Sequence, residues 1–247
     1  MNHRQKELSF VEKISIKKGI RNMERKDTLV VNLFGAPGAG KSTMAAYVFA
    51  MLKMGGVNCE LVTEFAKDKV WEDNSTALKN QCYVFGQQSY RLSRCAGQVD
   101  VIITDSPLPL SILYNTEEHL GDAFNSTCIR DFNSYNNLNI FLRRVKPYNP
   151  VGRIQTEDES NEKAVDILTM LTCNRIPVKL VNGDEEGCND ILTMIFKYLD
   201  DKSSAKEWYT DEEADGFPSE DMIVKYMEGD ETLDSLPLGE APDDWSF

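Results

Sequence analysis

One short stretch constrains the fold of this chain more than any other. Residues 33–43 read LFGAPGAGKST and contain a complete G-x-x-x-x-G-K-S/T phosphate-binding loop. The apolar run 29–34 leads into the loop, and a segment rich in Ala, Met and Leu follows it, which is the strand–loop–helix context that the motif requires. The N-terminus of such a helix favours an anion. We therefore predict that the chain binds a nucleoside triphosphate.

The loop residues have separate expected roles. Lys41 is placed to contact the outer phosphates, and the Ser42 hydroxyl to bind Mg²⁺. Main-chain N–H groups of the glycine-rich part would surround the phosphates. The residues predicted to bind the nucleotide are Gly35, Ala36, Pro37, Gly38, Ala39, Gly40, Lys41, Ser42, Thr43 and, from a later turn, Asn182.

Strand-like and helix-like segments alternate along residues 28–200. We expect strands at residues 29–34, 59–63, 99–104, 139–142 and 178–181, and helices at residues 42–54, 74–96, 157–173 and 191–199. The glycine at position 86 weakens the second of these helices. This alternation predicts an α/β fold in which a parallel sheet is flanked by helices and the ligand lies at the carboxyl ends of the strands.

The acidity of the chain is concentrated at its C-terminal end. The net charge is −13, and residues 201–247 alone hold fifteen acidic residues and three lysines. Residues 1–27 are instead basic in excess. We divide the chain into a basic extension (1–27), a nucleotide-binding domain (28–200) and an acidic tail (201–247). Because aromatic residues interrupt the tail, it is either a loosely packed appendage or a segment that binds a partner.

Composition also argues against several kinds of site. The two histidines, His3 and His119, are too few to suggest histidine-based acid–base or metal chemistry. The six cysteines include no C-x-x-C pair, so they indicate reduced thiols of a cytoplasmic protein. We expect neither a membrane span nor a signal peptide, because no apolar stretch approaches about 18 residues. The acidic tail weighs against general nucleic-acid binding.

Two carboxylates follow expected strands. Asp105 ends the run Val-Ile-Ile-Thr-Asp, where a phosphate-loop protein holds Mg²⁺ directly or through water. Glu64 follows Val62-Thr63 and is placed to accept a proton from an attacking hydroxyl. The alternatives are a turn role for Asp105 and a helix cap for Glu64. Asp68 is a weaker candidate for the same work as Glu64.

A basic loop follows the fourth strand. Residues 142–153 read LRRVKPYNPVGR, and Arg143 and Arg153 suit a lid that stabilises charge on a transferring phosphoryl group. The alternative is a solvated charged face, above all for Lys146. After the fifth strand, Asn182 begins an Asn-Gly-Asp turn near the expected nucleotide base, although turn chemistry alone explains these residues.

One further segment is a candidate for the acceptor site. In residues 83–91, Phe85 could stack on a ring, Gln87 or Gln88 could recognise a base or sugar edge, and Arg91 could contact a phosphate or hydroxyl. The aromatic positions also fit a core helix.

Four motifs taken together resemble the P-loop kinase-like ATPases encoded by many tailed bacteriophages: GAPGAGKS, LVTEFAKD, ITDSPL and R-x-K-P-Y-x-P-x-G-R. The likeness covers about residues 28–200. It extends more distantly to the ribosylnicotinamide kinase domain of bacterial NAD regulators and to deoxynucleoside and nucleoside monophosphate kinases. The resemblance implies a five-stranded parallel P-loop NTPase sheet, use of ATP and Mg²⁺, a small nucleoside-like acceptor and, for a phage-encoded protein, the host cytoplasm.

By position, the resemblance makes Lys41 and Ser42 phosphate and metal contacts, Glu64 or Asp105 the acceptor-side base, and the two lid arginines phosphate contacts. The leading hypothesis is an ATP-dependent phosphotransferase that acts on a nucleoside, nucleotide or related small molecule. One alternative is a kinase of a hydroxymethylated base in phage DNA. Another is an ATP-binding regulator that acts through its acidic tail. A homo-oligomer or a protein partner bound through the tail is left open.

Overall fold

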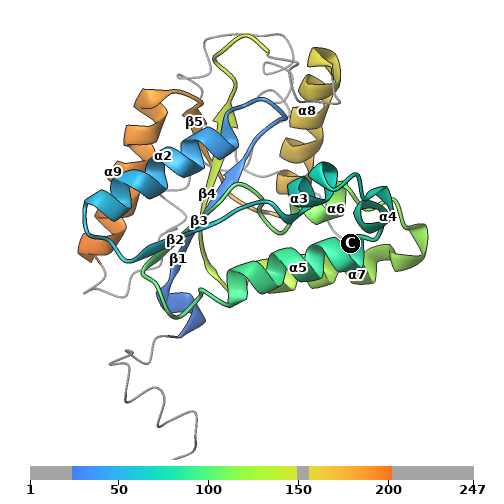
Figure 1. Ribbon diagram of the computed structural model, residues 1–247, viewed down its shortest axis with the longest axis horizontal. Coiled ribbons are helices and arrows are strands. Elements are labelled where there is room, and N and C mark those ends of the chain that lie inside the picture. The colour runs from blue at the N-terminus through green and yellow to red at the C-terminus, as the bar shows by residue number, and fades with distance from the viewer. Residues whose placement is uncertain (1–23, 149–155, 202–247) are drawn as a thin grey trace, which may run out of the picture.

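A five-stranded parallel sheet forms the centre of the molecule. The computed structural model describes residues 24–148 and 156–201. The strand order is β2-β3-β1-β4-β5, and helices cover both faces of the sheet (Figure 1). The strands are β1 (Leu29–Phe34), β2 (Cys59–Val62), β3 (Val101–Thr104), β4 (Asn136–Arg143) and β5 (Lys179–Asn182). The predicted α/β fold is thereby confirmed.

The helices are more numerous than the sequence pattern indicated. They are η1 (Arg25–Asp27), α2 (Lys41–Met54), α3 (Phe65–Trp71), α4 (Ser75–Lys79), α5 (Gln81–Ser93), α6 (Leu110–Leu113), η2 (Glu118–Leu120), α7 (Gly121–Phe132), α8 (Glu157–Cys173) and α9 (Glu185–Asp201). Helices α3, α6 and α7 were not predicted, and α9 begins at Glu185 rather than at position 191. No helix within the described residues is long and apolar enough to cross a membrane.

The single helix predicted for residues 74–96 is wrong, because the chain breaks at Asn80. The Asn80 backbone is extended, and its side chain accepts a hydrogen bond from the Tyr83 N–H at 2.9 Å, which starts α5 anew. Asn74 caps α4 in the same way through the Ala77 N–H at 3.0 Å. Asparagine is among the preferred N-cap residues, and two of them at this spacing favour two short helices over one long helix.

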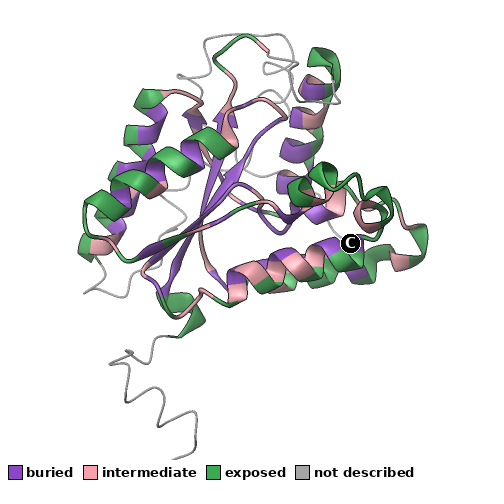
Figure 2. Ribbon diagram, in the orientation of Figure 1, coloured by how far each residue is buried: buried purple, intermediate pink, exposed green. Residues whose placement is uncertain are grey.

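The core lies on both faces of the sheet, and every residue of β1 is buried (Figure 2). Leu29, Val31 and Leu33 pack with apolar residues of α2 and α9, whereas Val30 and Phe34 pack with residues of α5, α7 and α8. A strand covered on both faces reads as a continuous apolar run, which is why β1 was recognisable from sequence. Asn32 is the exception, and its side-chain amide donates to Asn137 Oδ1 and Asn139 Oδ1.

The parallel sheet brings the segments that carry chemistry to one edge. In the register of the sheet, Val62 pairs with Thr104, Phe34 with Phe141, and Arg143 with Asn182. The phosphate loop and the segments after β2, β3, β4 and β5 therefore all leave from the carboxyl edge, as predicted for a ligand site in such a sheet.

Two glycine substitutions test this packing. A Cβ atom at Gly187, in the first turn of α9, would lie 1.9 Å from the Asn182 carbonyl oxygen, whereas one at Gly86 in α5 would meet nothing within 4 Å. We expect Gly187→Ala to lower the free energy of unfolding by about 2 kcal/mol or more through overpacking. Gly86→Ala should raise it by about 0.5–1 kcal/mol, because alanine is the better helix former. Urea unfolding followed by circular dichroism measures both. A neutral Gly187→Ala variant would contradict the close packing of α9 on β5.

Candidate functional site

The phosphate loop joins β1 to α2. Gly40 is the N-cap of α2 and adopts φ +94°, a left-handed conformation that glycine takes without strain. The Lys41 ammonium group donates hydrogen bonds to the carbonyl oxygens of Gly35 (2.7 Å) and Ala36 (3.1 Å), so the lysine lies across its own loop. From the other side, the Ser160 hydroxyl of α8 donates to the Pro37 carbonyl at 2.7 Å. The loop is therefore held by α8 and by its own lysine.

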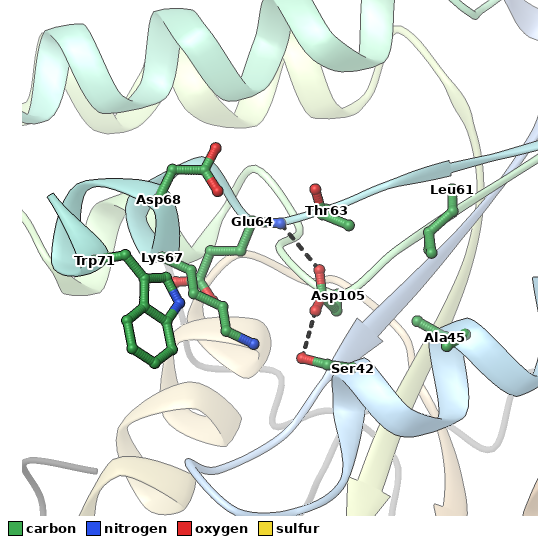
Figure 3. A pocket seen from close by; sticks show the side chains of 10 residues that line it. Ser42, Ala45, Leu61, Thr63, Glu64, Lys67, Asp68, Trp71 and Asp105 are labelled. Atoms are coloured by element: carbon green, nitrogen blue, oxygen red, sulfur yellow. Dashed lines mark hydrogen bonds between the residues drawn. The ribbon is translucent and has the colours of Figure 1, made fainter. Parts of the chain in front are cut away.

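Asp105 connects this loop to the second strand. The Ser42 hydroxyl donates to Asp105 Oδ2 at 2.6 Å, and the Glu64 backbone N–H donates to Asp105 Oδ1 at 3.1 Å (Figure 3). Asp105 is buried, with 5% of its surface exposed. One carboxylate thus fixes the first turn of α2 against the start of α3.

The Ser42 and Asp105 oxygens fit a magnesium ion. No group of three or more His, Cys, Asp or Glu side chains that could hold a metal exists among residues 24–148 and 156–201. Mg²⁺ does not require one at a nucleotide site, because it binds through one or two protein oxygens together with phosphates and water. A hydroxyl and a carboxylate in direct contact beside the phosphate loop provide these hard oxygen ligands.

Glu64 occupies the N-cap position of α3, but its side chain makes no capping hydrogen bond. Burial is the main cause that raises the pKa of this carboxyl group, and the nearby Asp105 carboxylate raises it further. Lys41 and Lys67 act in the opposite direction. The carboxyl group of Glu64 is therefore within electrostatic reach of both Lys41 and Asp105, and it binds a proton more readily than an ordinary glutamate.

Two residues of α5 hold the backbone on either side of Glu64. The buried Gln88 accepts a hydrogen bond from the Phe65 N–H at 2.9 Å and donates to the Thr63 carbonyl at 3.4 Å. Arg91 donates to the same carbonyl at 3.2 Å and forms an ion pair with Asp68. The structure thus places Gln88 and Arg91, two predicted acceptor contacts, on the protein backbone and on Asp68.

A pocket of about 330 Å³ opens beside Ser42 and Asp105 (Figure 3). It lies between α2, the end of β2 and α3. Its lining residues are Ser42, Ala45, Ala46, Leu61, Thr63, Glu64, Lys67, Asp68, Trp71 and Asp105. Ser42 and Asp105, the expected metal ligands, therefore line the same pocket as Glu64 and one face of α3.

The other predicted site residues lie apart from this pocket. Phe85 packs edge-on against Phe124 in the core, at a ring-centroid distance of 5.8 Å, which is the core alternative left open for it. Gln87 is half-buried on α5, a helix that contributes none of the described residues lining the pocket. Asn182 is the last residue of β5, next to Gly183, which closely approaches Ala39 of the phosphate loop.

The predicted lid is described only in part. Arg143 is the last residue of β4 rather than the start of a loop, and its carbonyl accepts the Gly183 N–H at 2.9 Å. Arg144, which was not a predicted site residue, donates to Ser160, Glu157 and Asn161 of α8. Arg153 and almost all of the acidic tail lie outside the described residues, as do residues 1–23 of the basic extension.

Sequence reasoning missed Lys67 and Trp71, although their spacing carries a signal. Glu64, Lys67, Asp68 and Trp71 follow the i, i+3, i+4, i+7 spacing of one helix face, and all four line the pocket. The stripe is mostly charged, whereas helices were sought through apolar periodicity. Spacing of polar residues after β2 would have identified α3 and its pocket face together.

Comparison with known proteins places this geometry in a family. A family model described as "AAA domain" matches residues 30–187, more than half of the chain. The chain belongs to the AAA domain family. No curated protein matches its sequence.

One solved structure of low sequence identity shares the fold. A NadR protein in complex with NR superposes with a TM-score of 0.56 at 18% identity, covering 78% of this chain and 61% of that protein. This chain thus spans less than two thirds of NadR. Looser matches are an APS kinase CysC from Mycobacterium tuberculosis in complex with AMPPNP and APS (TM-score 0.33, 14% identity, 59% of this chain and 98% of that chain) and a shikimate kinase from Bacteroides thetaiotaomicron (0.37, 14%, 70% and 98%). The NadR likeness supports the fold and assigns no substrate.

The raised pKa of Glu64 predicts a stability effect. A group whose pKa is raised on folding stabilises the fold below its unfolded pKa, and this contribution is lost as pH rises through the folded pKa. At neutral pH the ionised Glu64 therefore destabilises the ligand-free protein, and Glu64→Gln should raise its Tm. The gain should shrink as pH falls toward the folded pKa. Thermal unfolding at several pH values measures it, with Glu60→Gln on the exposed side of β2 as control. An unchanged or lower Tm for Glu64→Gln at neutral pH would contradict the burial argument.

Proposed function

We propose that this protein is an ATP-dependent phosphotransferase that acts on a small nucleoside-like molecule. The observation that carries the proposal is the two-sided hydrogen bonding of Asp105, which places Glu64 next to Ser42 and the phosphate loop. Glu64, Ser42 and Asp105 also line one pocket of about 330 Å³, and this supports a site in which a proton acceptor, a metal ion and an acceptor molecule would lie side by side.

The residues divide the work as follows. When ATP binds, Lys41 would give up its hydrogen bonds to two loop carbonyls and contact the outer phosphates instead. Ser42 and Asp105 would hold Mg²⁺, which neutralises charge on the phosphates when bound. Arg143 and Arg153 would donate to the transferring phosphoryl group from the lid side. The loop and the N-terminus of α2 would bind the phosphates of ATP.

Glu64 is the better candidate for the base. Both Asp105 oxygens already accept hydrogen bonds, from Ser42 and from the Glu64 N–H. The Glu64 carboxylate accepts the proton of the acceptor hydroxyl while the hydroxyl oxygen forms a bond to the γ-phosphorus and the bond to the ADP oxygen breaks. Its raised pKa makes it a stronger base than an ordinary glutamate. Rates should therefore fall in acid as this group becomes protonated.

The proposal is tested by ADP release from ATP and Mg²⁺ with a panel of nucleosides, nucleotides and nicotinamide riboside. We expect one acceptor class to stimulate release by the full-length protein. Lys41→Ala should reduce the stimulated rate by about 100-fold or more, because it removes a charge that stabilises the transition state. Lys53→Ala, in the last turn of the same helix, should retain the rate, since that lysine interacts with exposed Glu60 and with the ring of Phe49, away from the phosphate loop.

The pH profile gives a second test of the same site. Glu64→Gln should lose most of the acceptor-stimulated rate and also the acid limb of the profile, while binding ATP normally. If no acceptor stimulates ADP release by wild-type protein, or if Glu64→Gln keeps the wild-type rate and acid limb, the proposal fails.

A further inference from the structure

The pocket beside Ser42 is lined in part by a large aromatic side chain that is mostly exposed to solvent. Trp71 ends α3 and lines the pocket, yet 80% of its surface is exposed. Tryptophan is highly buried on average, so a largely exposed indole at the edge of a cavity is available to pack against a ligand. In Figure 3 the indole stands at one end of the pocket, Ala45 and Leu61 lie at the other, and the Ser42–Asp105 pair lies between them.

The charge of the lining restricts what the pocket can bind. Glu64, Asp68 and Asp105 contribute three carboxylates, against the single ammonium group of Lys67. No arginine belongs to the lining formed by the described residues. Arg91 of α5 is already paired with Asp68 and with the Thr63 carbonyl, so the charge of Asp68 is offset. Both oxygens of Asp105 accept hydrogen bonds. A phosphate group on the acceptor would therefore face the Glu64 carboxylate, and Lys67 is the only cation that the described lining offers it.

The size and the apolar part of the lining indicate a flat molecule. About 330 Å³ lies at the lower end of the range for small-molecule pockets, enough for one ring system and one sugar. Trp71 provides a flat apolar surface, and Thr63 and Glu64 provide polar groups in the same lining. A heteroaromatic ring against the indole would leave an attached sugar hydroxyl close to Glu64.

We propose that the acceptor is a nucleoside that carries no phosphate of its own, neutral or cationic, with its ring stacked on Trp71. Trp71 is then a specificity-determining residue. The Glu64 carboxylate, in a described lining that contains no arginine, selects against nucleoside monophosphates. The phosphoryl transfer to a hydroxyl of this nucleoside rests on the proposed function, whereas the stacking and the charge selection are binding properties that stand without it.

Fluorescence of Trp71 tests the binding directly. The chain has three tryptophans, and the other two, Trp208 and Trp245, are replaced by phenylalanine in the full-length protein so that Trp71 alone reports. The probes are adenosine, cytidine, thymidine and nicotinamide riboside with their 5′-monophosphates, added in the presence of Mg²⁺ and a non-hydrolysable ATP analogue. At least one nucleoside should quench Trp71 saturably and bind about tenfold or more tightly than its monophosphate, as a repulsive contact of about 1.4 kcal/mol would produce.

Variants separate stacking from charge. By calorimetry, Trp71→Ala should weaken binding of that nucleoside by about tenfold or more, and Trp71→Phe should retain most of the affinity, since both rings can stack. Asp68→Asn removes the carboxylate that pairs with Arg91. It should therefore reduce the ratio between the affinity for the nucleoside and the affinity for its monophosphate. Circular dichroism checks that each variant is folded.

The contradicting outcomes are distinct from those of the proposed function. Tighter binding of a monophosphate, unchanged affinity in Trp71→Ala, or no saturable quenching by any probe would each overturn this assignment. Nucleoside binding with the predicted preference but without ADP release would instead leave the assignment intact and reject the phosphotransferase.

Discussion

The paired hydrogen bonds of Asp105 are the contact on which the candidate site depends. One carboxylate oxygen accepts from the Ser42 hydroxyl at the start of α2, and the other from the Glu64 N–H at the start of α3. These two helices follow different strands, β1 and β2, which are separated in the sheet by β3. A buried carboxylate with both oxygens bonded fixes them together and places a hydroxyl, two carboxyl groups and a lysine around one point.

Two residues of the candidate site lower the stability of the folded domain. Burying the Glu64 carboxyl without a capping hydrogen bond raises its pKa and makes its ionised form unfavourable at neutral pH. Trp71 is largely exposed although its side chain would gain from burial. A core that covers both faces of the sheet can tolerate such local costs. Unfavourable groups gathered in one pocket are what selection for a ligand, rather than for stability, would leave.

Much of the fold followed from local pattern, and the parts that failed have physical reasons. Strand β1 and the phosphate loop were recognisable because two-sided burial and the loop backbone each demand particular residues. The register that brings Asp105 to Ser42 was implied by a parallel sheet, but the hydrogen bond to the Glu64 N–H was not. Gln88 was assigned to the ligand because nothing in a sequence shows that a glutamine will bind the backbone of a distant strand end. Helix α3 was missed because its periodic face is charged and lines a pocket instead of the core.

The central claim is that Asp105 and Ser42 form the metal side of a nucleotide site, and calorimetry of ATP binding with and without Mg²⁺ tests it most directly. Wild-type protein should bind ATP more tightly with Mg²⁺, and Asp105→Asn should lose about tenfold or more of that Mg²⁺-dependent gain while remaining folded. Glu64→Gln should retain the gain, because Glu64 belongs to the acceptor side. An Asp105→Asn variant with the full Mg²⁺-dependent gain would contradict the account.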